Sequence, residues 1–300
     1  MQSLNSLFII SLILLASCMP GEEAVEPFPR GEVKEAFIDA GSEKNTIVFY
    51  DLERDSVVAR TSPEAWDVHL WEGKLYINFF RSLKVAPFVG DLLSRTDTQN
   101  LNFQHLQLAD NQWQFVADSN YIIDMGLKTN GSHMGFYKFK FILNGAEAQL
   151  DFAELSSSSL ERKLISDGDY FSIINQSFTV LPKEDEYDLS FGKYTHYFPV
   201  EDINYEVYGA VSLNAQLAKT NTTFSNINSS MADTISWSSY YDAIGYDWKY
   251  YSLEKGAYEI DDQANYLIKN RSGFIYKMRF TNFYNSIGTS GHPSFEYELL

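Results

Sequence analysis

Residues 136–141 read Phe-Tyr-Lys-Phe-Lys-Phe, and residues 274–280 read Phe-Ile-Tyr-Lys-Met-Arg-Phe. In each stretch large apolar side chains recur at every second position, and lysine or arginine falls between them. A period of two places alternate side chains on opposite faces of an extended strand. We therefore expect strands with one buried and one solvated face, as in an antiparallel sheet.

Turn-forming pairs separate runs of this kind. They are Asn130-Gly131, Asn144-Gly145, Asp167-Gly168 and Ser272-Gly273. Residues 266–280 read as one complete hairpin. Helix signals are few, and only residues 87–95 and 213–219 are expected to form short helices. The predicted fold class is thus mostly β and antiparallel, with few short helices.

The chain also contains a weak internal repeat. Phe49-Tyr50 and Trp66-Asp67-Val68 recur 121 positions later as Tyr170-Phe171 and Tyr187-Asp188-Leu189. Three more pairs keep the same order: residues 75–78 with 211–214, 121–123 with 266–268, and 137–141 with 276–280. The repeat predicts two related β-rich halves, 45–155 and 168–300, with a linker at 156–167 between them.

The N-terminus predicts secretion and lipid attachment. Residues 7–16 are almost wholly apolar, too short to span a membrane, and lead into Leu15-Ala16-Ser17-Cys18, which holds the single cysteine of the chain. This arrangement is the lipobox of a bacterial lipoprotein, although residues 1–7 lack the usual Lys or Arg. We expect a signal peptide at 1–17, lipidation at Cys18 and an acidic tether at 18–44. The alternative is a cleaved signal peptide followed by an incidental cysteine.

Charge and aromatic content limit the kinds of partner that this protein is expected to bind. The chain has 23 Lys and Arg against 40 Asp and Glu, a net charge of -17, so it is expected to bind no nucleic acid. Membrane attachment would then rest on the lipid alone. The 22 Phe, 20 Tyr and 5 Trp are mostly expected in a β core, but such residues also line pockets for flat ligands and platforms for sugars.

The sequence contains no enzyme signature, such as Gly-x-Ser-x-Gly, a phosphate loop or His-Glu-x-x-His, and we expect a protein that is not an enzyme. A hydrolase would need an acid–base constellation that sequence order hides. None of the five histidines lies within five residues of another, so no metal-pair spacing exists. His69 is expected to pack in a strand, His133-Met134 to lie in a turn and His292 to be structural. His196 lies among aromatic residues and is the first candidate to contact a flat macrocycle.

Several of these pieces resemble a known family. Trp66-Asp67-Val68 and residues 187–191 resemble the "WDL-F" strand of the HmuY family, haem-binding lipoproteins of Bacteroidota. Residues 244–251, 266–269, 276–284 and 295–297 resemble the closing strands of that family. Glu22-Glu23 resembles the acidic signal that directs Bacteroidota lipoproteins to the cell surface. The resemblance implies an HmuY-like antiparallel β-fold, anchored at the outer membrane, that captures haem or a related tetrapyrrole for an outer-membrane haem receptor.

The resemblance is weakest at the iron ligands. Family members hold the iron with two axial side chains, histidine or methionine, and one of them follows the strand that looks like residues 247–252. This chain has Leu253 at that place, and residues 215–234 offer only Met231. His196 and Met231 are therefore the candidate haem-binding residues. The alternative is a non-haem cell-surface module that binds a partner protein or a glycan, or serves as a structural spacer.

Overall fold

The structure is a computed structural model of the 300-residue chain. It describes residues 31–41, 43–105, 115–128, 131–198, 200–201 and 203–300. Cys18, the signal peptide and the first part of the predicted tether lie outside the described residues. In the described part of the chain, no helix combines the length and the apolar character needed to cross a membrane.

The described residues form mostly β-strands. Every pairing between the strands is antiparallel, which confirms the predicted fold class. The strands are β1 (Lys34–Phe37), β2 (Ile47–Asp51), β3 (Ser56–Thr61), β4 (Val68–Trp71), β5 (Lys74–Ile77), β6 (Lys84–Phe88), β7 (Gln104–His105), β8 (Asn120–Asp124), β9 (Phe136–Asn144), β10 (Glu147–Glu154), β11 (Glu161–Ser166), β12 (Tyr170–Ser172), β13 (Ser177–Thr179), β14 (Leu189–Phe198), β15 (Ile203–Val211), β16 (Gln216–Thr220), β17 (Lys249–Ser252), β18 (Ala257–Ile260), β19 (Asn265–Lys269), β20 (Ile275–Tyr284) and β21 (Ser290–Leu299).

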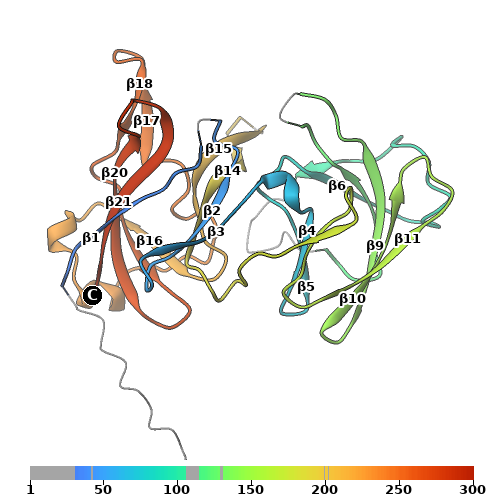
Figure 1. Cartoon of the computed structure of the whole chain (residues 1–300), viewed down its shortest axis with the longest axis horizontal. Coiled ribbons are helices and arrows are strands. Elements are labelled where there is room, and N and C mark those ends of the chain that lie inside the picture. Colours follow the sequence, from blue (N-terminus) through green and yellow to red (C-terminus); the bar gives the residue numbers. More distant parts are fainter. Residues whose placement is uncertain (1–30, 42, 106–114, 129–130, 199, 202) are drawn as a thin grey trace, which may run out of the picture. The chain divides into compact units, whose positions relative to one another are not determined.

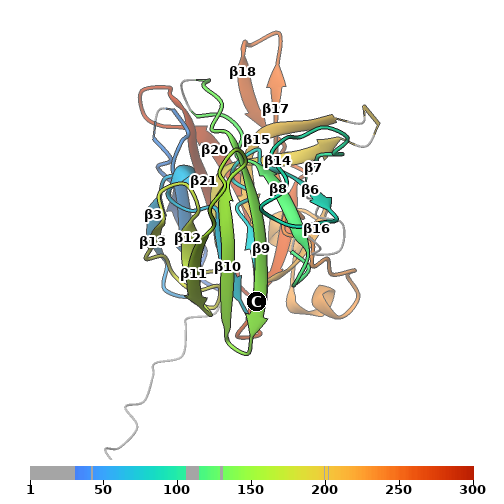
Figure 2. The same ribbon diagram turned by 90° about the vertical axis from the view of Figure 1, so that its right-hand side faces the viewer.

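The strands form two groups of sheets and a separate hairpin, β17–β18. Sheets β1-β21-β20-β19-β16 and β15-β14-β2-β3 combine the two ends of the described chain, and we call them the outer lobe. Sheets β11-β10-β9-β8-β6-β7 and β13-β12-β4-β5 are the inner lobe. In Figure 1 blue β1 runs beside red β21, and Figure 2 shows β9 to β12 of the inner lobe from the front.

The two lobes share one strand order, so the fold contains an internal structural repeat. The order β11-β10-β9-β8-β6 corresponds to β1-β21-β20-β19-β16, and β13-β12-β4-β5 corresponds to β3-β2-β14-β15. One copy therefore runs from β1 to β10 and the other from β11 to β21. The first three strands of each copy pair with the remainder of the other copy. The chain has thus exchanged two equivalent three-strand segments within itself.

The predicted repeat falls on equivalent strands, but the sheets do not follow the predicted halves. Phe49-Tyr50 and Tyr170-Phe171 occupy the equivalent strands β2 and β12, as the sequence match requires. However, β2 pairs with β14 and β12 pairs with β4, so the sheets cross the boundary between 45–155 and 168–300. In addition, β11 fills much of the linker predicted at 156–167, and β1 lies within the predicted tether. Sequence similarity identifies equivalent strands, whereas tertiary contacts decide which copy each strand joins.

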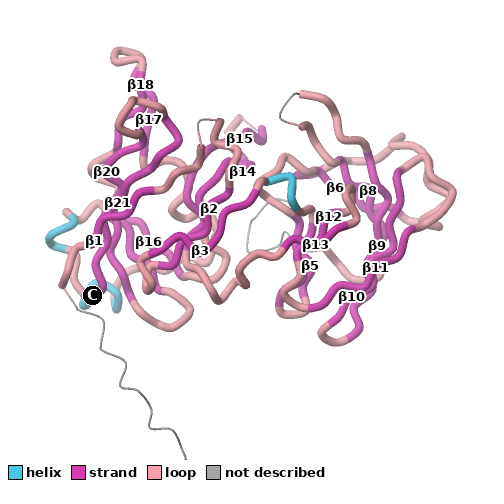
Figure 3. Tube along the Cα trace, in the orientation of Figure 1, coloured by secondary structure: helices cyan, strands magenta, loops and turns pink. Residues whose placement is uncertain are grey.

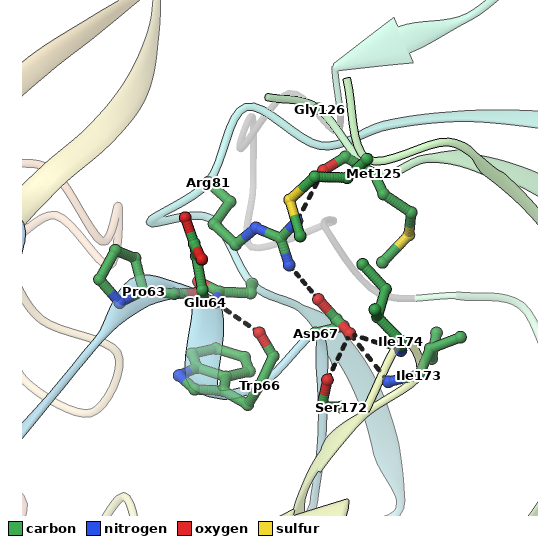
Figure 4. A network of polar contacts seen from close by, with 12 residues as sticks. Pro63, Glu64, Trp66, Asp67, Arg81, Met125, Gly126, Ser172, Ile173 and Ile174 are labelled. Carbon is green, nitrogen blue, oxygen red and sulfur yellow. Dashed lines mark hydrogen bonds and ion pairs between the residues drawn. The ribbon is translucent and has the colours of Figure 1, made fainter. Parts of the chain in front are cut away.

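A buried carboxylate holds the exchanged segment of the inner lobe. Asp67 lies directly before β4, and its Oδ2 accepts hydrogen bonds from Ser172 Oγ (3.1 Å) and Ile173 N (2.8 Å), just after β12. Its Oδ1 forms an ion pair with Arg81 (Figure 4). Asp67 and Arg81 are both buried. These contacts join two segments of the chain that are more than a hundred residues apart.

The outer lobe contains an equivalent set of hydrogen bonds. Asp188, the equivalent of Asp67, accepts a hydrogen bond from Leu52 N (2.8 Å) through Oδ2, just after β2. Asn78 and Asn214 are also equivalent. Each donates through Nδ2 to the carbonyl of the aromatic residue that precedes its aspartate, at 2.9 and 2.6 Å. The duplication therefore extends from strand order to individual hydrogen bonds.

The predicted solvated face of two strands is exposed only in part, because Lys140 and Arg279 reach solvent but another lysine in each strand does not. Lys138 and Lys277, at equivalent places in β9 and β20, are both buried. Lys138 Nζ donates to the carbonyls of Leu93 and Arg95, and Lys277 Nζ pairs with Glu298 at 2.8 Å. Segments from outside each sheet cover these lysines, and a strand's own alternation does not reveal such a cover.

The predicted helices are also wrong. Residues 87–88 belong to β6 and residues 216–219 to β16, because each pairs with a neighbouring strand. In the described residues the helices are short 3-10 turns, η1 (Pro63–Ala65), η3 (Phe224–Asn226) and η4 (Ser229–Asp233). Figure 3 shows them in cyan.

Two glycines bring an irregular segment against β15. Ala210 and Gly245 exchange backbone hydrogen bonds of 3.0 Å in both directions. A Cβ atom on Gly209 would overlap the carbonyl oxygen of Gly245. The close approach therefore needs glycine at 209, and it positions residues 241–246 beside the β14–β15 hairpin.

We expect Asp67→Ala to lower the free energy of unfolding by about 3–5 kcal/mol, because it leaves the Arg81 guanidinium buried without its carboxylate. Chemical denaturation followed by tryptophan fluorescence measures the change. Asp97→Ala removes a carboxylate that is exposed in its pair with Arg95 and should change the free energy by less than about 1 kcal/mol. Equal losses in the two variants would contradict the role given to Asp67.

We expect Gly209→Ala to lower the free energy of unfolding by about 3 kcal/mol or more, because the added methyl group displaces the backbone at Gly245. Gly145→Ala is the control. That turn glycine has a φ of +69° but open space around it, so the variant measures backbone strain alone, about 1–2 kcal/mol. Thermal unfolding of both variants tests the difference, and a smaller effect at 209 than at 145 would refute the steric argument.

Candidate functional site

One face of the outer part of the β14–β15 hairpin is mostly apolar. The residues on this face are Tyr194, His196 and Phe198 on β14 and Ile203, Tyr205 and Val207 on β15. Tyr194 is fully buried, whereas Tyr205 and Ile203 are 65% and 49% exposed. The hairpin therefore carries its apolar face out of the core and into solvent. An exposed apolar face with one histidine in it is an unusual surface for a soluble domain.

His196 is oriented by a carboxylate. Its Nδ1 lies 2.8 Å from Oδ2 of Asp242, and its side chain is 28% exposed. A carboxylate can only accept, so Nδ1 carries the proton and Nε2 of the neutral ring keeps its lone pair. Nε2 has no hydrogen-bond partner among the described residues. A histidine held in this way is prepared to bind a metal through Nε2.

Aromatic rings surround this histidine. The ring centroids of Phe198 and Tyr246 lie 4.9 and 5.0 Å from that of His196, both edge-on. Burial, assisted by Asp247 and Asp242, raises the pKa of Tyr246, so its hydroxyl stays protonated at neutral pH. The cluster offers flat apolar surface, one phenol and one imidazole, which suits a planar aromatic ligand.

Three contacts place Asp242 and Tyr246 beside the hairpin. Gly245 pairs with β15, as described above. Ser212 N donates to the carbonyl of Tyr241 (2.7 Å), and the Tyr241 hydroxyl donates to the carbonyl of Thr195 (3.2 Å). Asp242 lies 46 residues after His196, and no spacing in the sequence indicated this pair.

Met231 lies elsewhere. It belongs to η4 and packs against a small cluster of Ala218, Ile227 and Leu267. In Figure 3 the cyan 3-10 turns beside β16 lie apart from the β14–β15 hairpin. The structure therefore does not bring Met231 and His196 together as a pair of ligands. Leu253 lies in the turn after β17 and is 90% exposed.

Three other histidines, His69, His133 and His292, are engaged in structure, and the side chain of His105 lies outside the described part of the chain. The His133 Nε2 atom lies 2.8 Å from Asp124 Oδ1, and its Nδ1 accepts from Gly135 N at 3.2 Å, so both ring nitrogens have partners. His69 is buried and stacks on Tyr170, with 3.7 Å between the two ring centroids. His292 is buried. Among the described residues no three metal-binding side chains gather into a site.

Comparison with known proteins identifies the family of this chain. No curated protein matches the chain. The solved structure of apo PinO from Porphyromonas gingivitis is 11% identical, has a TM-score of 0.35 and covers 90% of this chain and 97% of its own. That of an apo HmuY analogue from Tannerella forsythia is 10% identical, has a TM-score of 0.27 and covers 90% and 97%. The model of the HmuY protein family matches residues 43–297, and the chain belongs to that family.

Proposed function

We propose that the apolar face of the β14–β15 hairpin binds haem or a related tetrapyrrole, with Nε2 of His196 as a ligand of the iron. The observation that carries the proposal is the His196–Asp242 pair, set among aromatic rings with Nε2 unoccupied by the described residues. Asp242 would act as a positioning residue, because it selects the tautomer and the ring orientation. Membership of the HmuY family supports the choice of ligand.

The apolar face would supply much of the affinity. Covering Tyr205, Ile203 and Phe198 with a flat ring removes apolar surface from water, at about 25 cal/mol per Å2. One strong axial ligand then suffices for a specific complex, and Met231 is not required. The iron chemistry belongs to the ligand, while this chain binds the ring, orients the imidazole and excludes water.

Attachment to the cell surface completes this proposal. A lipid on Cys18 would hold the protein at the outer membrane, where it would pass the ligand to an outer-membrane haem receptor. The predicted lipobox and the acidic Glu22-Glu23 support this location. The protein would then act in iron acquisition as a surface carrier.

A second candidate is a non-haem module that binds a glycan or a partner protein. Exposed tyrosines favour it, because Tyr250 and Tyr251 on β17 are 53% and 52% exposed and Tyr240 is 44% exposed. Tyrosine rings on an open surface stack well on sugars. A mature protein that gives no saturable haemin signal but binds an oligosaccharide would establish this alternative.

Titration of the mature protein with haemin tests the proposed function. We expect a saturable shift of the Soret band in the native chain. In His196→Ala the spectrum should lose the features of an imidazole-ligated iron. In Asp242→Asn the affinity for haemin should be about 10–100-fold lower. His133→Ala is the matched control, because both nitrogens of that ring already have partners, and it should bind as the native chain does. Unchanged spectra in His196→Ala would eliminate that ligand.

A buried lysine makes the site region sensitive to pH. Lys249 Nζ donates to the carbonyls of Tyr208 (2.6 Å) and Tyr246 (3.2 Å) and lies 4.2 Å from the ring centroid of Trp248. Burial, with a further contribution from Lys44, lowers the pKa of Lys249 to about 7. The ammonium group therefore donates to the backbone of Tyr246, and this hydrogen bond weakens when the lysine loses its charge.

Between pH 7 and pH 10 the unfolded chain keeps a proton on this lysine that the folded chain has released. We therefore expect the free energy of unfolding to rise with pH in this window, by up to about 1.4 kcal/mol per pH unit from Lys249. Denaturation at several pH values should show a shallower rise in Lys249→Met than in the native chain. Parallel profiles would show that Lys249 does not titrate in this range.

A further inference from the structure

Among the histidines whose side chains the structure describes, His69 is the one whose two ring nitrogens both face hydrogen-bond acceptors. Its Nδ1 lies 3.1 Å from the carbonyl oxygen of Asp169, and its Nε2 lies 3.3 Å from Oε1 of Glu184. A carbonyl and an ionised carboxylate can only accept, and a neutral imidazole has a single N–H group. The ring therefore cannot satisfy both neighbours unless the pair holds one additional proton.

The other described histidines need no such proton. Each ring nitrogen of His133 has a partner of the matching kind, and His196 faces a carboxylate through one nitrogen only, as described above. His292 accepts from Asn285 Nδ2 (3.3 Å) through Nε2, so its Nδ1 can carry the proton and face Asp39 Oδ1 at 3.2 Å. The additional proton is thus specific to the His69–Glu184 pair.

Burial prevents water from satisfying the pair. The side chains of His69 and Glu184 are 1% and 3% exposed. Neither Nε2 nor Oε1 has a further hydrogen-bond partner among the described residues. The ring of Tyr170 stacks on the imidazole within 6° of parallel and covers one of its faces. A buried carboxylate that faced only a nitrogen lone pair would carry an uncompensated charge, which is costly.

The groups around the pair do not neutralise Glu184. They are three tyrosines on separate segments, Tyr76, Tyr170 and Tyr187, and three carboxylates in nearby turns, Glu72, Asp167 and Glu186. Burial, with the charge of Glu184, raises the pKa of each tyrosine, so all three stay protonated at neutral pH. Within the described ranges no lysine or arginine pairs with Glu184. A protonated imidazole is the cation that the geometry leaves for it.

The pair joins the inner lobe to the segment that leads into β14. His69 lies on β4 of the inner lobe, and Glu184 lies in the connection between β13 and β14. Glu184 Oε2 accepts from the Tyr187 hydroxyl (3.2 Å), and the Tyr187 carbonyl accepts from Asn214 of the outer lobe (2.6 Å). A change at the pair therefore acts on residues that connect the two lobes.

We propose that the His69–Glu184 pair is a proton-dependent contact, in which the imidazolium form holds residues 182–188 against the inner lobe and loss of its proton at alkaline pH loosens them. Deprotonation leaves the Nε2 lone pair opposite a carboxylate, so the attraction between the two side chains is lost. The unfolded chain releases this proton at a lower pH than the folded chain. The contact therefore stabilises the fold at neutral pH, and this contribution disappears as the pH rises.

NMR of the full mature chain labelled with 13C and 15N tests the proposal. We expect both ring nitrogens of His69 to be protonated at neutral pH and one of them to lose its proton on titration to about pH 10. Over the same range, amide exchange at residues 183–188 should accelerate at least about tenfold beyond its intrinsic rise with pH.

Glu184→Gln is the decisive variant. Its carboxamide can donate to Nε2 of a neutral ring and still accept from Tyr187, so His69 should stay neutral and the additional exchange should disappear. Asp185→Asn is the control, because it removes an exposed carboxylate from the same turn and should leave the titration of His69 unchanged. Lys249 is present in all these chains, so the differences between them exclude its contribution.

Two results would overturn the proposal. One is a His69 ring that carries a single proton throughout the titration of the native chain. The other is amide exchange at residues 183–188 with the same pH dependence in the native chain and in Glu184→Gln. Circular dichroism checks the folding of each variant, and if Glu184→Gln does not fold, the titration of His69 in the native chain decides.

Discussion

The buried Asp67 carboxylate, bonded to Arg81 and to the chain just after β12, is the interaction on which the arrangement of the two lobes depends. A buried charge is tolerated only when it is paired and hydrogen-bonded. Arg81 follows β4 closely in the sequence, whereas Ser172 and Ile173 lie more than a hundred residues away. Asp188 repeats the contact in the outer lobe through Leu52. Together the two aspartates link each three-strand segment to the lobe in which it pairs.

The two lobes differ most clearly in one hairpin. The outer lobe lengthens one hairpin, β14–β15, well beyond its inner-lobe counterpart β4–β5, and gives its outer end two different faces. One face is apolar and contains His196, whereas Lys193 and Glu206 point to the other. The equivalent of His196 does not exist in the shorter hairpin, so duplication here has produced divergence rather than two identical sites.

Several features were predictable because they depend on local pattern. Alternation identified the strands at 136–141 and 274–280, and the order of matching pieces identified the repeat through β2, β12 and their neighbours. The buried state of Lys138 was not predictable, because the segment that covers it comes from elsewhere in the chain. The prediction of short helices failed for a similar reason. Residues 216–219 pair with a neighbouring strand, and this pairing overrides weak helix signals.

By itself, the sequence determined the mostly β class, the duplication, the family and the choice of His196 as a candidate, since these follow from side-chain period, order and composition. Only the tertiary structure decided which copy each strand joins, that Asp242 orients His196, and that Met231 lies elsewhere. The physical reason is distance along the chain. Hydrogen bonds between residues 46 or more than a hundred positions apart leave no periodic trace, so they become visible only when the backbone has brought the partners together.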